Sequence, residues 1–547
     1  MLRSRPMDPL RRCSNAIAPL LAGGPDRRRL ERTLPWALLL ALAVVLLRSA
    51  WLCDDTYFSL RSAAHLAQGI GLRFNPAERV QAFSNPLWTL ALAGMLRLGL
   101  DPYQGILGLS LGCTLGAAWL VTRHIARWPG GALLVVAALA SSKAFVDFGA
   151  CGLENPLLYL LMAAFLALWT AGPRPEERAL PLALLAALLG LTRLDALVLV
   201  APHLLALRWR RAPRGMGARL LLGSLPLVAW LGFALVYYGS PLPCPAVAKL
   251  AGAAMSRPEL IHRGWCYLLD TLAWDRVSLP LVAVAIAAGL SRHDRRWTPS
   301  AAGLLLYLGA VVFAGGDFML GRFLALPVLV GVALLVGQAI WRRPAWLCGG
   351  LALLLAASLS SRASPLRTGP GYGAGPDMRP AFRRYEAIDE RYWYYRSSGL
   401  LARLARYEAP RIPPVRAGAA PSVVLAGMAI EAWVAGPACH AVQKHGISDP
   451  LLARMPPSRG GQLRAGHVER LIPRGYAESL EKGGDRLQDP RVRALYDDLL
   501  LVTRGPLWTR ARWAAIARLA VGTHAGVRDL ELRRDAQWPA PTATHGS

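Results

Sequence analysis

The chain has 547 residues, of which 54% are hydrophobic, and its mean hydropathy is +0.32. This composition is too apolar for an ordinary soluble protein and predicts a polytopic membrane protein that lies in a lipid bilayer. The formal net charge of +28 comes from 62 Lys and Arg against 34 Asp and Glu. The basic residues gather in short clusters between apolar runs, as in cytoplasmic loops, without the basic and aromatic interleaving of a nucleic-acid site. We therefore expect no nucleic-acid partner.

Eight cysteines are scattered along the chain without a CxxC pair and without the spacing of metal ligands. This pattern predicts no metal site and no redox site. Cys244 and Cys266 fall in one expected outer loop, where they either form a disulfide or remain two small buried thiols. The unbridged alternative is favoured. No cofactor requirement is visible in the sequence, and a need for a divalent cation stays open.

Twelve apolar runs follow a basic N-terminus of 32 residues that contains eight arginines and is expected to be cytoplasmic. The runs lie at 34–52, 86–99, 105–121, 131–145, 155–171, 179–191, 193–207, 219–238, 278–290, 300–314, 320–340 and 344–360. Basic connectors such as 208–219 are placed inside by the positive-inside rule. The run 86–99 is short for a span, so we expect it to lie along or re-enter the membrane. This predicts about eleven transmembrane helices.

The composition changes near residue 360, where the chain becomes polar and rich in Arg, Pro and Gly. Residues 33–360 are expected to form a mostly α transmembrane helix bundle with a catalytic outer loop at 53–85. Residues 361–547 are expected to form a C-terminal α/β soluble domain outside the membrane, after a linker at 367–380. The predicted fold class is therefore mostly α, with one extracytoplasmic domain.

Asp54 and Asp55 open the first outer loop, where the chain leaves its first apolar segment. Charge at a membrane edge is costly, so paired acids there indicate a functional site. The alternative is that the pair caps a helix beginning at Thr56, with Arg61 as an ion-pair partner. Arg61 and Asn85, in the same polar loop, are candidate substrate-binding residues.

Further charged residues fall between apolar runs that leave little room for a loop. Arg193 and Asp195 lie in LTRLDAL, Asp317 and Arg322 lie in GGDFMLGRF, and Lys249 lies in PLPCPAVAK. Each of these sites is either an ordinary buried ion pair or a ligand of a phosphate, which Arg and Lys bind by charge-assisted hydrogen bonds. The three cations are all expected at the outer face, which favours the phosphate-binding alternative.

Glu154, in CGLENP, is expected in another outer turn. The favoured interpretation is that it marks a helix start with Pro156 in the first turn, and substrate binding is the alternative. The tail collects six further polar candidates with no metal-ligand spacing, which we interpret as loop and interface residues. These are His440, His445, Asp449, Arg454, His467 and Glu469.

Several segments, in this order, resemble the terminal β-(1→2)-arabinofuranosyltransferases, polytopic glycosyltransferases of the GT-C type whose relatives include proteins labelled as flagellar motor control factors. The longest is DDTYFSLRSAAHLAQGIGLRFNPAERVQAFSNPLWTL, and the others are CGLENPLLYLL, LTRLDALVL, YYGSPLPCPAVAKL, GGDFMLGRFLALP, GISDPLLARMP and GHVERLIPRGYAESL. Together they extend from about residue 52 to 480. Two segments depart from the family pattern, PLPCP in place of PLPNT and TRLD in place of TRPEG or TRPD, so arabinose is not assumed as the sugar.

The resemblance implies a polyprenyl-phosphate sugar donor and a glycan acceptor at the outer face of the bacterial inner membrane. It implies that Asp54 or Asp55 takes the proton of the acceptor hydroxyl or stabilises positive charge on the sugar ring. It also implies that Arg193, Lys249 and Arg322 neutralise the lipid phosphate. The alternative function is a non-enzymatic membrane assembly or motility factor with an extracytoplasmic interaction domain. A transporter is less favoured because the sequence shows no inverted repeat.

Overall fold

The computed structural model describes residues 25–209, 215–251, 255–291, 294–374, 387–409, 411–415, 423–458, 463–464, 467–484 and 486–527. The chain divides into two compact units. The helical unit contains residues 1–52, 106–225 and 260–410, and the α/β unit contains residues 53–105, 226–259 and 411–547. Most of the expected N-terminus, 1–24, and the second part of the expected linker, 375–380, lie outside the described residues.

The described helices of the helical unit are α2 (Pro25–Ser49), α6 (Pro129–Ser141), α7 (Lys143–Gly149), α8 (Asn155–Trp169), α9 (Ala179–Thr192), α10 (Leu197–Trp209), α14 (Ser278–Leu290), α15 (Thr298–Ala314), α16 (Arg322–Val336), α17 (Pro344–Leu359), α18 (Glu390–Ser398) and α19 (Leu400–Leu404). It also has the π-helical turn η1 (Val121–Ala126) and the 3-10 turns η2 (Pro175–Arg178), η3 (Leu194–Ala196) and η4 (Ala339–Arg342). Three helices contribute residues to both units: α5 (Pro102–Leu120), α11 (Met216–Tyr238) and α13 (Arg257–Trp274).

All twelve apolar runs are helical, but few of the helices are long. Pro102–Ala126 and Met216–Tyr238 are long and apolar enough to cross a membrane. Among the described residues, the count of such helices rises from two to four if two bent pairs, α6 with α7 and α13 with α14, are each one span. The expected count of about eleven spans is therefore not confirmed, because many apolar helices have 10–17 residues and a full span needs about 20.

Small residues allow the helices of the helical unit to approach closely. A Cβ atom added at Gly303 of α15 would lie 2.2 Å from the carbonyl oxygen of Leu199 on α10. A Cβ atom added at Gly264 of α13 would lie 2.3 Å from the carbonyl oxygen of Val312 on α15. Apolar helices gain little from hydrophobic burial inside a bilayer, so such close backbone packing is a main source of their association.

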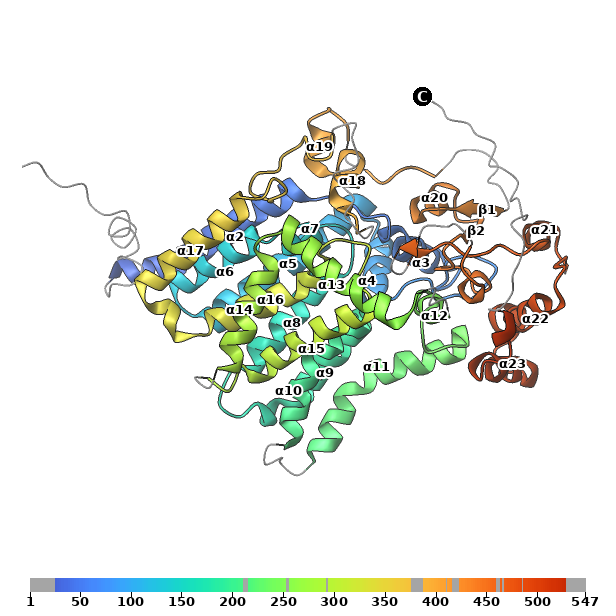
Figure 1. Ribbon diagram of the computed structural model, residues 1–547, viewed down its shortest axis with the longest axis horizontal. Coiled ribbons are helices and arrows are strands. Elements are labelled where there is room, and N and C mark those ends of the chain that lie inside the picture. Colours follow the sequence, from blue (N-terminus) through green and yellow to red (C-terminus); the bar gives the residue numbers. More distant parts are fainter. Residues whose placement is uncertain are drawn as a thin grey trace, which may run out of the picture. The chain divides into compact units, whose positions relative to one another are not determined.

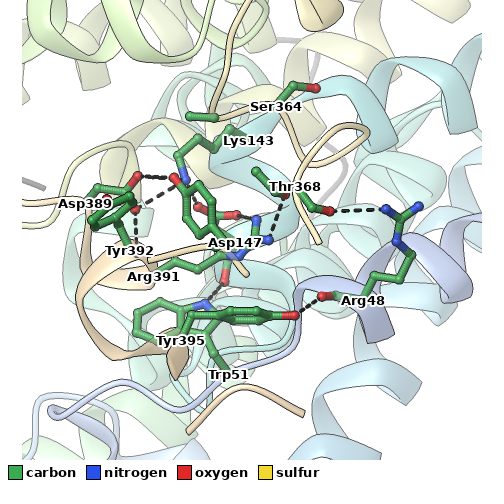
Figure 2. Close-up of polar contacts among 12 residues, drawn as sticks. Arg48, Trp51, Lys143, Asp147, Ser364, Thr368, Asp389, Arg391, Tyr392 and Tyr395 are labelled. Carbon is green, nitrogen blue, oxygen red and sulfur yellow. Dashed lines mark hydrogen bonds and ion pairs between the residues drawn. The ribbon is translucent and has the colours of Figure 1, made fainter. Parts of the chain in front are cut away.

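A buried ionic network joins α7 to the segment that begins α18 (Figure 2). Lys143 pairs with Asp147 and lies 3.2 Å from Asp389, while Arg391 donates to Asp147 at 2.8 Å. Two negative and two positive side chains compensate each other's charge at a site from which water is largely excluded. Because unpaired charge is costly there, these ion pairs fix residues 387–398 to α7.

Aromatic and hydroxyl groups complete the network. Tyr372 and Trp274 donate to Asp389, and the Arg391 guanidinium lies 4.6 Å from the centre of the Tyr372 ring. The same guanidinium donates to Thr368 at 2.8 Å. Residues 361–374 and 387–410 thus belong to the helical unit, whereas the sequence had placed them in the soluble domain.

The described elements of the α/β unit are α3 (Thr56–Ala67), α4 (Pro86–Arg97), α12 (Cys244–Ala251), α20 (Ala429–Val434), α21 (Tyr476–Lys482), α22 (Pro490–Arg504), α23 (Arg510–Ala520), the turns η6 (Leu452–Arg454) and η7 (Ala525–Val527), and the strands β1 (Val423–Ala426), β2 (His440–Gln443), β3 (Leu463–Arg464) and β4 (His467–Val468). β1 and β2 are parallel, with Val423 opposite His440, and α20 is their crossover helix (Figure 1). β3 and β4 are antiparallel. Of these described elements, only β1, α20 and β2 show the alternation of strand and helix that is typical of an α/β fold; β3 and β4 follow each other directly, and three helices come after them.

The core of the α/β unit includes two residues that the sequence had assigned to loops or interfaces. His440 is 8% exposed and lies in β2, so that interpretation is wrong for His440, whereas Asp449 does lie in a loop, between β2 and η6, but is fully buried. Asp449 accepts hydrogen bonds from the backbone N–H groups of Leu451 and Leu452 and from the Tyr476 hydroxyl. These bonds explain how a carboxylate is accommodated among apolar side chains.

Candidate functional site

Asp54 lies two residues before the first residue of α3, Asp55 holds the N-cap position, and no side chain caps that helix. The two carboxylate oxygens of Asp54 accept hydrogen bonds from the backbone N–H groups of Ala429 and Ile430, each at 2.9 Å. These are the first two residues of α20, so Asp54 caps a helix that is 375 residues away in the sequence. The first turn of α3 uses carbonyl oxygens instead, including that of Asp54 itself, which accepts from Tyr57 N. The Asp54 carboxylate therefore does not provide the expected cap of α3.

The surroundings of Asp54 favour its protonated form. Burial raises the pKa of this carboxyl to about 7, and the hydrogen bonds from Ala429 and Ile430 oppose that rise. The nearby negative charges of Asp55 and Glu431 add to the rise. A group with a pKa near 7 changes charge at the pH of ordinary function, which is the property required of a general base.

Arg61 is a buried residue of α3. Its guanidinium donates to the carbonyl oxygens of Phe74 at 3.0 Å, Gly436 at 2.8 Å and Cys439 at 2.7 Å, and also to that of Ala432. The side chain is 2% exposed. In this state the guanidinium is occupied by backbone groups, and its contact with substrate remains a prediction.

Asn85 connects the two helices that follow the acidic pair. Its Oδ1 atom accepts from Ser59 of α3 at 2.8 Å and from Thr89 of α4 at 3.0 Å. The residue is 6% exposed. Asn85 therefore holds the expected outer loop together, and substrate binding by this side chain remains a prediction.

Four of the predicted residues form one cluster in the helical unit. Arg193 and Arg322 each donate to the same oxygen of Glu154, Oε1, at 3.0 Å. Arg193 also forms a bidentate ion pair with Asp195, with both distances 2.9 Å. The ordinary buried ion pair considered for Arg193 is thus present, and the cluster has two positive and two negative groups.

Two further residues shape this cluster. The Tyr307 hydroxyl donates to Asp195 at 3.0 Å, and the Arg193 guanidinium lies 5.3 Å from the centre of the Phe323 ring. Glu154 is fully buried, whereas the Arg193 side chain is 15% exposed and that of Arg322 is 11% exposed. Glu154 precedes α8, with Pro156 in its first turn as predicted, but its carboxylate binds the two arginines and does not cap α8.

The remaining predicted residues are Asp317, Lys249 and the two cysteines. Asp317 is 7% exposed and accepts from Phe318 N at 2.9 Å. Lys249 is exposed on α12, in the α/β unit. Cys244 and Cys266 are both free thiols. Among the described residues, no group of three or more His, Cys, Asp or Glu side chains is arranged to hold a metal ion.

Sequence reasoning missed α20 as the partner of Asp54. Glu431, on α20, accepts from Gly427 N and Met428 N, so two carboxylates bind the four successive N–H groups of residues 427–430. An acid in the first turn of a short helix is a weak signal, because it also suits an ordinary capping box. Tyr307 and the Lys143 network were missed as well, since their partners are far apart in sequence.

Comparison with known proteins gives two relatives. The chain is similar to two arabinofuranosyltransferases. The terminal beta-(1->2)-arabinofuranosyltransferase of Corynebacterium glutamicum is 29% identical over 342 residues, a match that covers 51% of this chain and 46% of that protein. The protein of the same name from Mycobacterium tuberculosis is 29% identical over 282 residues, covering 46% of this chain and 42% of the relative. The chain thus spans less than half the length of each. No family model and no solved structure matches the chain.

Proposed function

We propose that the chain is a membrane glycosyltransferase that moves a sugar from a polyprenyl-phosphate donor to a cell-envelope glycan on the outer face of the bacterial inner membrane. The observation that carries this proposal is the Asp54 carboxyl, whose pKa burial raises to about 7, in a chain similar to two arabinofuranosyltransferases. A pentofuranose such as arabinose is the first sugar to test, because the names of both relatives specify arabinofuranosyl transfer.

In the proposed reaction the acceptor hydroxyl attacks C1 of the donor sugar. The bond between C1 and the phosphate oxygen breaks, and polyprenyl phosphate leaves with the electron pair. Asp54 accepts the hydroxyl proton, a task that suits a carboxylate with a pKa near the working pH. Asp55 is half-buried and is the neighbour of Asp54 in the sequence. Its negative charge raises the pKa of Asp54, so it helps the reaction by stabilising the protonated carboxyl that Asp54 becomes after it accepts the proton.

The leaving phosphate is proposed to bind Arg193 and Arg322. Both guanidiniums are held by Glu154 and are partly exposed, so binding a phosphate needs little reordering of their side chains. Positive groups that are already in place where negative charge develops stabilise a leaving group effectively. Lys249 is exposed and is proposed as a further phosphate ligand.

An apolar cavity in the helical unit supports a lipid-linked donor. It has a volume of about 150 Å³ and is lined by α6, α14, α16 and α17, with Arg276, Val284 and Trp341 among its lining residues. Its lining is almost entirely hydrocarbon, which suits an isoprenoid chain. Arg276 lines the cavity and is exposed.

The proposal is tested with Asp54→Asn in purified protein supplied with a panel of polyprenyl-phosphate sugars and an envelope glycan. We expect transfer to fall at least about 100-fold, the usual contribution of a positioned general base. The fold should persist, because the amide oxygen of Asn can still accept from one N–H group of α20. The matched control is Asp101→Asn, an exposed aspartate that caps α5 by accepting from Gln104 N at 2.9 Å, and it should retain activity.

Absence of transfer with every donor, in a folded wild-type preparation, would contradict the proposed function. That result would favour the alternative of a membrane assembly or motility factor. Equal activity of Asp54→Asn and wild type would contradict the assigned base and would leave another group to accept the proton.

A further inference from the structure

We propose that α20 is a positioning helix for Asp54, and that Arg61 and Glu431 are positioning residues that act through it. This inference rests on the proposed function for its kinetic consequences only. It assigns a catalytic purpose to the C-terminal region, since α20 is supplied by a segment that follows Asp54 by some 375 residues.

One short stretch of the chain holds α20 at both ends. Asp54 binds its first N–H groups, and Arg61 binds the carbonyl oxygens of Ala432, Gly436 and Cys439 at and beyond its last turn. Seven residues separate Asp54 from Arg61, which corresponds to about 10 Å along a helix, and six residues of α20 span about 9 Å. The two lengths match.

The N-terminus of a helix carries partial positive charge and its C-terminus partial negative charge. Asp54 and Arg61 place a carboxylate and a guanidinium at the complementary ends of α20. Anchoring by Arg61 therefore keeps the amide groups of Ala429 and Ile430 aimed at Asp54, at 2.9 Å each.

Glu431 fixes the turn that precedes α20. Its Oε2 atom accepts from Gly427 N at 2.6 Å and from Met428 N at 3.2 Å, just before the residues that bind Asp54. Its charge also opposes ionisation of Asp54, as does that of Asp55. Glu431 therefore has two effects: it fixes the turn, and it raises the pKa of the Asp54 carboxyl.

Packing supports the same arrangement. The Tyr57 ring of α3 lies 6.2 Å from the Trp433 ring of α20, and Trp433 donates to the carbonyl oxygen of Pro413 at 2.9 Å. The Arg61 guanidinium lies 5.2 Å from the centre of the Phe74 ring. These contacts leave α20 little freedom to rotate, so the direction of its first N–H groups is defined.

The test uses two variants with opposite expected effects. Arg61→Lys cannot reach four carbonyl oxygens, so α20 should loosen, the hydrogen bonds to Asp54 should weaken and the pKa of Asp54 should rise. Glu431→Gln keeps an oxygen for Gly427 N but removes the negative charge, so the pKa of Asp54 should fall. Glu431 is exposed, so this variant should fold normally.

The matched control is Arg512→Lys. Arg512 is fully buried in the same unit and donates to the carbonyl oxygens of Val502, Leu507 and Tyr237, as Arg61 does to its own set, but it has no contact with α20 or Asp54 among the hydrogen bonds of the described residues. It should lower stability without moving the Asp54 midpoint.

The readout is the titration of Asp54 itself, followed by the infrared carboxyl band that is present in wild type and missing in Asp54→Asn. We expect its midpoint to move to higher pH in Arg61→Lys and to lower pH in Glu431→Gln, and the midpoint of the pH–rate profile to move with it. Unchanged infrared midpoints in both variants would overturn the positioning role, even if transfer is found. Shifted infrared midpoints in a protein that transfers no sugar would support the positioning role and contradict the proposed function.

Discussion

Arg193 and Arg322, which are 129 residues apart in the sequence, bind the same oxygen atom of Glu154, each at 3.0 Å. Two guanidiniums on one carboxylate repel each other, and the negative charge of that carboxylate offsets the repulsion. Glu154 therefore determines whether the cluster holds together.

The first prediction concerns this shared carboxylate. Glu154→Gln should lower the free energy of unfolding by about 3 kcal/mol, because Arg322 loses the carboxylate that it binds at 3.0 Å and Arg193 keeps only Asp195. Thermal unfolding in detergent measures the change. The control is Glu177→Gln, whose ion pair with Arg174 is 73% and 61% exposed and should contribute less than about 0.5 kcal/mol. Equal effects of the two substitutions would contradict the role of Glu154.

The second prediction is a pH dependence. Burial raises the pKa of Asp54 to about 7, so the ionised base becomes populated as the pH rises through 7. The transfer rate should increase across that range and level off above about pH 8. The stability of the fold should change with pH in the opposite direction. Because folding raises the pKa of Asp54 from 3.8 to about 7, the contribution of this carboxyl to the free energy of unfolding is complete below pH 3.8 and is lost as the pH rises through 7. A transfer rate that is flat between pH 6 and 8 would exclude Asp54 as the base.

The third prediction concerns the buried ionic network of α7. Arg391→Met should destabilise the protein by about 3 kcal/mol, because Asp147 and Thr368 lose a buried partner. Cleavage by protease should increase near residues 387–398, which the network fixes to α7. Arg406→Met, at an ion pair with Glu408 whose side chains are 36% and 43% exposed, is the control. Unchanged cleavage in Arg391→Met would show that other contacts hold this segment.

The fourth prediction concerns the apolar cavity. Val284 lines it and is 54% exposed, so Val284→Trp should fill the cavity without disturbing the core. We expect a rise of at least about tenfold in the KM for a long-chain donor, with little change for a donor that carries a short chain. Val228→Trp, on α11 and 52% exposed, adds the same side chain at a residue that is not among those lining the cavity. An equal KM in both variants would exclude the cavity as the site of the lipid chain.

The fifth prediction concerns helix packing. Gly303→Leu should separate α10 from α15, since its Cβ atom would meet the carbonyl oxygen of Leu199 at 2.2 Å. Backbone atoms cannot give way as a side chain can, so a large loss of folded protein is expected. Gly309→Leu, on the same helix with open space around its Cβ position, is the control. Size-exclusion chromatography of the two variants distinguishes these outcomes.

The sequence by itself determined the helical segments and the residues that carry unusual charge. Each apolar run became a helix because a helix pairs its own backbone N–H and C=O groups, so an apolar run can be buried whatever its partners are. Arg193 and Asp195 form the pair that their spacing permits, since two residues at one turn are always near each other. The number of membrane spans was less predictable, because composition does not determine where a helix bends or ends.

Only the tertiary structure decided what the key carboxylates bind. Asp54 was expected to cap its own helix or to act on substrate, and it binds the first N–H groups of α20. Glu154 was expected to mark a helix start, and it joins Arg193 to Arg322. These partners lie 39 to 376 residues away, and local sequence patterns carry no information about such contacts. Hydrogen bonds and ion pairs depend on distance and direction in space, which the completed fold alone defines.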